Sequence, residues 1–202
     1  MITAEDAMRR LKEGNSRFVA GEIDPDRLRY QTRREQLGES QEPFAIIVGC
    51  SDSRVPVEIV FDQGLGDLFV IRVAGNIVSK TQLGSIEIAA GILGARLVVV
   101  LGHTNCGAVD AALKTVQHGT VPESDNLRLI VETIRPSAER AIARGGNSSH
   151  AELVDRVGRE NARRAVDAIR NSPGIIRQLA EEEGLVVVGA EYSLASGAVE
   201  FV

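Results

Sequence analysis

The chain has 202 residues, and its 23 lysines and arginines against 28 aspartates and glutamates give a formal charge of −5. At about 100–200 residues per domain this length predicts one domain spanning 1–202, and 44% hydrophobic with 25% charged residues excludes a disordered chain. The lack of tryptophan and of a long basic run argues against a nucleic-acid partner, and no apolar run reaches the ~18 residues of a membrane span. The N-terminus has no signal-peptide pattern, so we expect a cytoplasmic protein with no membrane partner.

The first 40 residues predict an N-terminal helical arm in front of an α/β core over 41–202. Thr3, with Asp6 three residues later, is a capping-box-like start for a first helix. A second, strongly charged helical piece runs from Asp26 to Leu37, after the break at Asp24-Pro25. The apolar face of the first helix is intermittent, which indicates a helix only partly committed to its own core.

Five short apolar runs after the arm predict strands. The first run is continuous, as expected of a strand buried on both faces of a parallel sheet, whereas the last pairs with the fourth as a hairpin around Ser196-Gly197. We expect the strand order 2-1-3-4, with the fifth strand antiparallel at an edge. The runs are Phe44 to Val48, Asp67 to Val73, Leu97 to Leu101, Leu185 to Val188 and Ala198 to Val202.

Apolar residues at helical spacing separate these strands, which predicts an α/β fold with a central, mostly parallel sheet flanked by helices. Gly94 and Gly119 are expected to end two of the helices, and Pro136 to kink a third. Ser172-Pro173 is expected as the N-cap and first residue of the last helix. The helices before this last one are marked by Leu83 to Leu93, Val109 to Val116, Leu127 to Ile134 and His150 to Arg170.

Three side chains that bind soft metals follow predicted strands. Cys50 comes after the first strand, and His103 and Cys106 after the third. Ligands of open α/β sheets bind at the carboxyl ends of strands, where the strand order reverses, so we expect the three to converge. The i, i+3 spacing of His103 and Cys106 predicts one face of the opening turn of a helix. Two thiolates and one imidazole form a Zn²⁺ set with a free fourth position; a buried thiol without metal is the alternative.

The run Cys50-Ser51-Asp52-Ser53-Arg54 places a carboxylate beside the same cluster. Arg54 can pair with Asp52, and such a pair lowers the pKa of the carboxyl and orients it to accept a hydrogen bond from a zinc-bound hydroxide. A surface salt bridge within a turn is the alternative. The motif of a cysteine phosphatase is excluded, because Pro56 stands where that motif requires arginine. The phosphate-binding motif that ends in Gly-Lys-Ser/Thr is absent as well.

Cys50 to Arg54, taken with the run from Gly102 to Gly107, resembles the paired motif of the β-class carbonic anhydrases. The similarity continues through 61–69 and 72–76 and extends over nearly the whole chain. It implies a lyase (carbonate dehydratase) that interconverts CO₂ and bicarbonate through zinc-bound hydroxide, with one Zn²⁺ per subunit. It also implies a homodimer or homotetramer whose active sites lie near the dimer interface.

The resemblance implies that Cys50, His103 and Cys106 are the zinc ligands. It also implies that Asp52 and Arg54 form the catalytic dyad. Three further positions match substrate contacts of the family. Gln41 matches a glutamine whose amide reaches the substrate across the dimer interface, Phe69 an apolar pocket wall, and Gly107 a backbone N–H contact. Their plain structural alternatives are a polar loop residue, a core residue and a helix start.

In some members of the family the aspartate binds zinc once its arginine partner is lost, which makes Asp52 a conditional fourth ligand in a closed state. The bicarbonate-inhibition pocket of that subgroup uses a tryptophan, an arginine and a tyrosine. Ile47 stands at the tryptophan position here, although Arg72 and Tyr192 match the other two. We therefore do not expect a full inhibitory pocket.

Two other functions stay open. A related zinc hydrolase of carbonyl sulfide or carbon disulfide would use the same attack, with pocket shape deciding the substrate. A non-catalytic zinc-binding or redox-sensing module would hold the metal without turnover. The remaining histidines, His118 and His150, are expected on the solvated surface, so the sequence names no proton shuttle.

Overall fold

The computed structural model describes residues 2–22, 34–35, 37–38, 40–146 and 148–202. Its centre is a five-stranded sheet in the order β2-β1-β3-β4-β5, which confirms the predicted order. β1, β2, β3 and β4 run parallel, and β5 pairs antiparallel with β4 at the edge. The strands are β1 (Ala45–Gly49), β2 (Leu68–Arg72), β3 (Leu97–His103), β4 (Val186–Tyr192) and β5 (Val199–Phe201).

Side chains along the central strands alternate between two buried faces of the sheet. Ile46 and Val48 of β1 pack into one apolar cluster, whereas Ala45 and Ile47 pack into another on the opposite side. Every residue of β1 and β3 is buried. These strands are apolar throughout because helices cover both of their faces.

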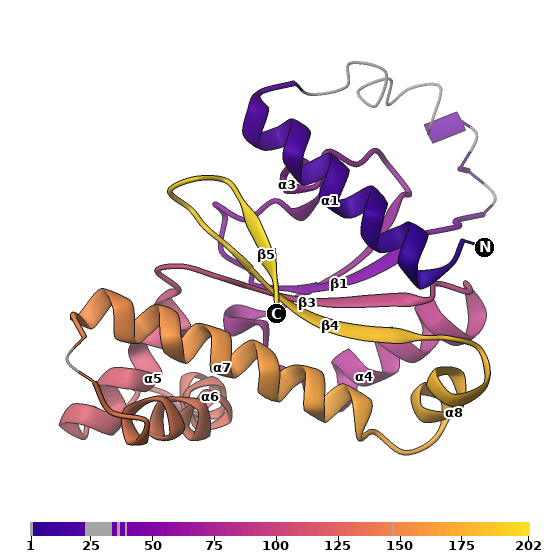
Figure 1. The fold of residues 1–202 in the computed structure, drawn as a ribbon. Coiled ribbons are helices and arrows are strands. Elements are labelled where there is room, and N and C mark those ends of the chain that lie inside the picture. The colour runs from indigo at the N-terminus through magenta and orange to yellow at the C-terminus, as the bar shows by residue number, and fades with distance from the viewer. Residues whose placement is uncertain (1, 23–33, 36, 39, 147) are drawn as a thin grey trace.

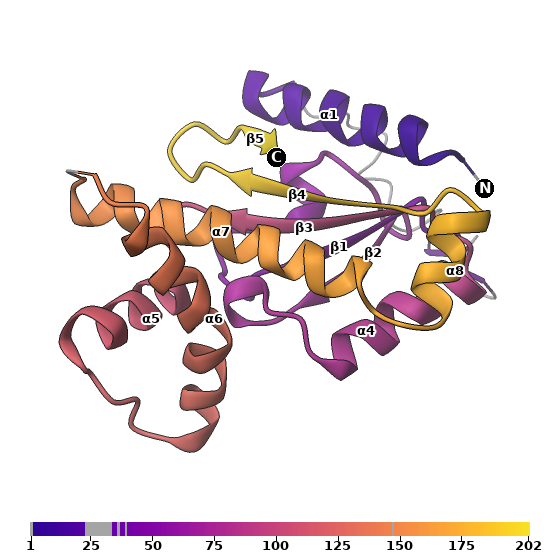
Figure 2. The same ribbon diagram turned by 60° about the horizontal axis from the view of Figure 1, so that its bottom comes forward.

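One face of the sheet is covered by α7 (His150–Arg170), α4 (Lys80–Glu87), the π-helical turn η3 (Ile88–Ile92) and α8 (Ile175–Glu182) (Figures 1 and 2). Ser149 caps α7, and Glu152 completes a capping box by accepting a hydrogen bond from the Ser149 N–H. Gly94, with φ 79°, follows η3 as predicted. Small residues such as Ala162 and Ala165 on α7 let that helix lie close to the strands.

The other face carries α1 (Ala4–Ala20) and the short α3 (Val57–Val60) (Figure 1). Thr3 caps α1 by accepting a hydrogen bond from the Asp6 N–H, as the sequence predicts. Ala7 and Leu11 of α1 are buried in the same apolar cluster as Ile47 of β1. The first half of the N-terminal arm therefore packs against the sheet.

α5 (Gly107–His118) and α6 (Asp125–Ala143) pack beside the first half of α7 and form a third apolar cluster beyond the carboxyl ends of the strands (Figure 2). Gly119 ends α5 in a left-handed conformation, which confirms the predicted stop. α6 continues through Pro136 because Ser137, Ala138 and Ala141 after it are buried against the neighbouring helices. Tertiary packing thus outweighs the missing N–H of the proline.

The prediction for the start of α8 was wrong. Ser172 and Pro173 precede the helix, and its N-cap is Gly174, whose φ of 92° and ψ of −137° are accessible to glycine and strained for other residues. Ser172 instead closes α7 by donating its N–H to the Ile169 carbonyl. The charged helical piece expected from Asp26 to Leu37 lies largely outside the described residues. Within the described ranges, none of the helices has both the length and the apolar composition that a bilayer span requires.

Candidate metal centre

Three soft-metal ligands meet at the carboxyl end of the sheet. Cys50 directly follows β1, His103 is the last residue of β3, and Cys106 is the N-cap of α5. Their ligand atoms lie within 4.8 Å of one another, and the two Sγ atoms are 4.0 Å apart. Each residue is at most 4% exposed. The neighbouring strands β1 and β3 therefore bring together residues that are 56 positions apart in sequence.

His103 and Cys106 do not share a helical face, so that part of the prediction was wrong. A tight turn through Thr104 and Asn105 joins the end of β3 to α5, and Asn105 has a φ of 54°. The turn is held from outside: the Asn105 N–H donates to Asp155 Oδ1 (3.1 Å), and the Leu194 N–H donates to Thr104 Oγ1 (3.0 Å).

The His103 ring is oriented for metal binding. Its Nδ1 lies 2.9 Å from the Thr104 carbonyl oxygen, which can only accept, so Nδ1 carries the proton and Nε2 the lone pair of a neutral ring. Nε2 is buried and has no hydrogen-bond partner among the described residues. Burial by itself would lower the pKa of His103, but contacts with Cys50, the Thr104 carbonyl and the Asp52 carboxylate together outweigh burial and raise the pKa. An orphaned, buried nitrogen beside two thiols fits a metal ligand.

The two cysteines are free, and their sulfur atoms are in hydrogen-bond contact. The Cys106 thiol donates toward Cys50 and so holds the pKa of Cys50 below its usual range, while the same bond and burial raise the pKa of Cys106. Two thiolates on one tetrahedral Zn²⁺, at about 2.3 Å each, lie about 3.8 Å apart. The observed 4.0 Å between the sulfurs fits that requirement without rearrangement.

Asp52 and Arg54 form a forked ion pair beside the cluster. Arg54 Nε donates to Asp52 Oδ1 (2.9 Å) and Nη2 to Oδ2 (2.7 Å), and the Arg54 N–H adds a third bond to Oδ1 (2.9 Å). These bonds hold the pKa of the Asp52 carboxyl well below its usual range. Oδ2 also lies 3.9 Å from His103 Nε2, so the carboxylate reaches the edge of the cluster.

The two residues matched to an inhibitory pocket end different strands of the sheet. Arg72 ends β2 and donates to the backbone carbonyls of Cys50 (2.9 Å) and Asp52 (2.6 Å), so it braces the first ligand loop. Tyr192 ends β4, is buried, and lies three strands away from β2, or about 14 Å at ~4.8 Å per strand.

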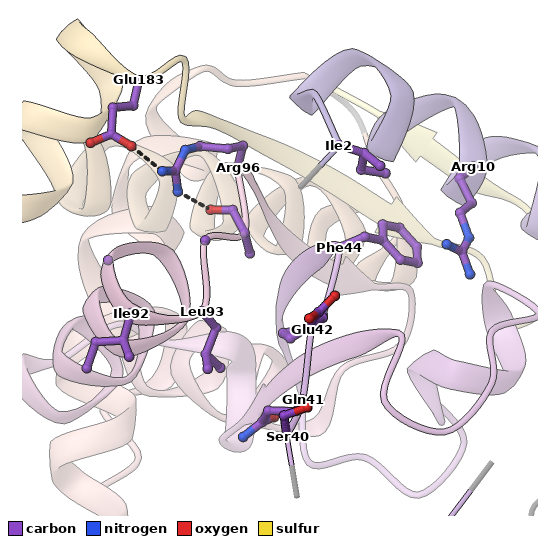
Figure 3. Close-up of a pocket in the computed structure, with 14 residues that line it drawn as sticks. Ile2, Arg10, Ser40, Gln41, Glu42, Phe44, Ile92, Leu93, Arg96 and Glu183 are labelled. Carbon is purple, nitrogen blue, oxygen red and sulfur yellow. Dashed lines mark hydrogen bonds and ion pairs between the residues drawn. The ribbon is translucent and has the colours of Figure 1, made fainter. Parts of the chain in front are cut away.

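Gln41 lies at the opposite end of β1 from Cys50. It is exposed and borders a cavity of about 680 Å³ formed by residues that precede β1 and β3, together with Arg10 and Ile2 of the N-terminal segment (Figure 3). Arg96 and Glu183 pair at the rim of this cavity. The five residues of β1 alone span about 16 Å at ~3.3 Å each, so Gln41 does not reach the cluster of its own chain.

Phe69 is also remote from the cluster, whereas Gly107 adjoins it. Phe69 lies opposite Ile46 in the register of β2 and packs into the core cluster beneath α4 and α7. Gly107 follows Cys106 as the first residue of α5 and is exposed. A Cβ at Gly107 would meet no atom within 4 Å, so neither packing nor a left-handed backbone requires glycine there. His150, expected on the surface, is half exposed and pairs with Asp110 of α5 (2.7 Å).

Gly75 and Asn161, to which no role was assigned from the sequence, both support the cluster. The Gly75 N–H donates to Cys50 Sγ (3.3 Å), and Asn161 of α7 donates from Nδ2 to the Gly75 carbonyl (2.8 Å). Gly75 stands in a stretch matched to a known family, which was a usable signal. Asn161 lies inside a helix rich in charged residues, where nothing in the sequence distinguishes a buried asparagine from an exposed one.

Comparison with known proteins gives a consistent result. A family model described as carbonic anhydrase matches residues 45–199. A carbonic anhydrase of Mycolicibacterium smegmatis is 41% identical over 195 residues, which cover 96% of this chain and 91% of that protein. Carbonic anhydrase 2 of Mycobacterium tuberculosis is 40% identical over 191 residues, which cover 95% of this chain and 89% of that protein.

Solved structures share the fold. A β-carbonic anhydrase of Coccomyxa, crystallised with acetazolamide, superposes with a TM-score of 0.76 at 27% identity and covers 89% of this chain and 80% of its own. Work on two tetrameric β-carbonic anhydrases of Sordaria macrospora provides a structure with a TM-score of 0.75 at 27% identity, covering 85% of this chain and 87% of its own. All three residues of the cluster fall within the span matched by the family model.

Proposed function

The chain belongs to the β-class carbonic anhydrase family, whose members interconvert CO₂ and bicarbonate, and from this premise we propose that the Cys50, His103 and Cys106 cluster is its active centre. The observation that carries the proposal is the buried, unpartnered His103 Nε2 facing two thiols 4.0 Å apart. Three protein ligands leave a fourth position open, as in catalytic rather than structural zinc sites.

The family uses zinc, and we propose that these three residues hold one Zn²⁺ per chain. Bound zinc supplies the Lewis acidity that turns water into a nucleophile at neutral pH. Asp52, ionised and fixed by Arg54, accepts the hydrogen bond that aims this nucleophile at CO₂. While Arg54 holds both carboxylate oxygens, Asp52 is not available as a ligand; release from Arg54 would make it the conditional fourth ligand.

Gln41 lies away from the cluster of its own chain and would need a second copy of the chain to reach a metal centre. Gln41 is exposed beside a cavity at the far end of β1, which supports an arrangement in which it serves the centre of a partner subunit. The apolar wall at Phe69 and the N–H of Gly107 are the other proposed substrate contacts. A homodimer or homotetramer supplies this arrangement, and the Sordaria macrospora relatives are tetrameric. Location in the cytoplasm stays a prediction.

Stopped-flow CO₂ hydration by the zinc-loaded protein tests the proposal. We expect catalysis that rises toward alkaline pH and is lost, together with the metal, in Cys50→Ser. Stoichiometric zinc without hydration above pH 8 would instead indicate a zinc-binding or redox-sensing module. Faster turnover of carbonyl sulfide than of CO₂ would indicate the related hydrolase.

A further inference from the structure

The sulfur of Cys50 receives a backbone hydrogen bond that the proposed chemistry does not use. The Gly75 N–H donates to Cys50 Sγ (3.3 Å) from the loop that follows β2. A hydrogen bond to a thiolate lowers the energy of its lone pairs and so tunes how strongly the sulfur donates to a metal. The position of this N–H therefore matters to any metal held at the cluster.

Gly75 needs external support to keep its N–H in place. It has a φ of 68° and a ψ of 20°. Glycine adopts this left-handed conformation without strain, but it adopts many other backbone conformations as readily. A Cβ there would lie 2.6 Å from Ile134 Cδ1 and 3.2 Å from Ala108 Cβ, so a side chain would displace Ile134 as well as strain the left-handed backbone. The position of this N–H thus depends on glycine, the residue type with the most flexible backbone, and must be set by neighbouring groups.

That support comes from α7. Asn161 is 4% exposed and donates from Nδ2 to the Gly75 carbonyl oxygen (2.8 Å). Gly158, one turn earlier, faces the end of β3, where a Cβ would make an ordinary van der Waals contact of 3.8 Å with the His103 carbonyl oxygen. The helix that passes behind His103 therefore also fixes the loop that contacts Cys50.

We propose that Asn161 is a positioning residue that holds the Gly75 N–H against the Cys50 sulfur and thereby strengthens zinc binding and sets the donor strength of that ligand. This inference rests on the proposed zinc site. Asn161 touches neither metal nor substrate and acts through Gly75 alone.

The test compares Asn161→Leu with Asn15→Leu in the full-length protein. Asn15 is a matched control because it is also buried (7% exposed) and donates to two backbone carbonyls, those of Val60 and Gly197, but it lies on α1 across the sheet. Both variants are expected to lower the melting temperature. Only Asn161→Leu should weaken zinc binding, by about 10-fold or more in competition with a chromophoric chelator.

A second measurement reports on the sulfur itself. In protein loaded with Co²⁺ in place of zinc, Asn161→Leu should shift the sulfur-to-cobalt charge-transfer band to longer wavelength, since the thiolate loses its hydrogen bond, while Asn15→Leu keeps the wild-type band. If Asn161→Leu yields no folded protein, Asn161→Ser, whose hydroxyl is too short to reach Gly75, carries the same two expectations.

The outcomes are distinct. A wild-type protein that binds no zinc would overturn the proposed function and this inference together. A wild-type protein that binds zinc, with Asn161 variants that keep its affinity and its cobalt spectrum, would overturn the Asn161 inference alone. Equal losses in the Asn161 and Asn15 variants would also overturn it, because they would show a general effect of stability.

Discussion

Arg54 controls the orientation of Asp52 rather than its charge. The guanidinium lowers the pKa of the carboxyl, so its removal lets that pKa rise toward the ordinary value of about 3.9, still far below neutrality. Asp52 therefore stays ionised at pH 7 in Arg54→Ala but loses its forked partner. We expect kcat/KM for CO₂ hydration to fall by roughly 10- to 100-fold, by the same factor at pH 7 and pH 9.

Arg54→Lys provides the control for this prediction. Lysine keeps the positive charge but cannot donate two parallel hydrogen bonds to one carboxylate, so it should restore only a minor part of the rate. Stopped-flow measurements across pH 7–9 decide the matter. Full activity in Arg54→Lys would mean that charge alone suffices, and a loss confined to the acid end of the range would mean that Arg54 acts by keeping Asp52 ionised.

Single residues also show what a sequence can and cannot predict about this site. Cys50 and His103 were predictable because parallel strands end at one edge of the sheet, so residues after β1 and β3 must meet. The Thr104–Asn105 turn was not, since i, i+3 spacing fits a helix and a tight turn equally well. The contact between Asn161 and Gly75 joins a side chain to a backbone oxygen 86 positions away, and such a contact leaves no periodic pattern.

Among the elements, α1 is held to the sheet at a point where no side chain fits. A Cβ at Gly14 would lie 1.8 Å from the Phe61 carbonyl oxygen, a backbone atom that cannot swing aside. Gly14→Ala must therefore lift α1 and break the neighbouring hydrogen bonds of Asn15 to Val60 and Gly197. We expect a loss of about 3 kcal/mol in the free energy of unfolding, measured by urea denaturation.

Gly84→Ala is the matched substitution for Gly14→Ala. Gly84 lies inside α4, and a Cβ there would meet no atom within 4 Å. Alanine loses less backbone entropy than glycine on forming a helix, so this variant should gain about 0.5–1 kcal/mol. If Gly14→Ala gained as much stability as Gly84→Ala, helix propensity would dominate at both positions, and the contact between α1 and Phe61 would not exclude a side chain at Gly14.

Elements with strong local patterns were predicted well. α7 was predicted at its observed bounds, and the structure shows a capping box of Ser149 and Glu152 at its start. The start of α8 was predicted too early, because Ser172-Pro173 was interpreted from local sequence preference alone. The helix begins only after Gly174, whose backbone conformation is strained for other residues.

At the scale of the whole molecule, one chain divides its predicted site residues between the two ends of the sheet. Cys50, His103 and Cys106 lie at the carboxyl ends of the strands, and Gln41 lies at the amino end of β1 beside exposed apolar side chains such as Ile2 and Ile92. A second copy that covers this end would bury those side chains and carry Gln41 to the partner's centre. A single domain over 1–202 would then be half of a working unit.

Complementation between two defective chains tests this division. Gln41→Ala keeps its own metal ligands but lacks the glutamine, whereas Cys50→Ser keeps Gln41 but loses the metal, so each alone should hydrate CO₂ slowly. Refolded together, mixed dimers would contain one complete centre, with zinc from the first chain and Gln41 from the second. We expect stopped-flow activity well above the mean of the two separate preparations. Activity equal to that mean would show that Gln41 does not act across an interface, because a contribution within one chain cannot be restored by a partner.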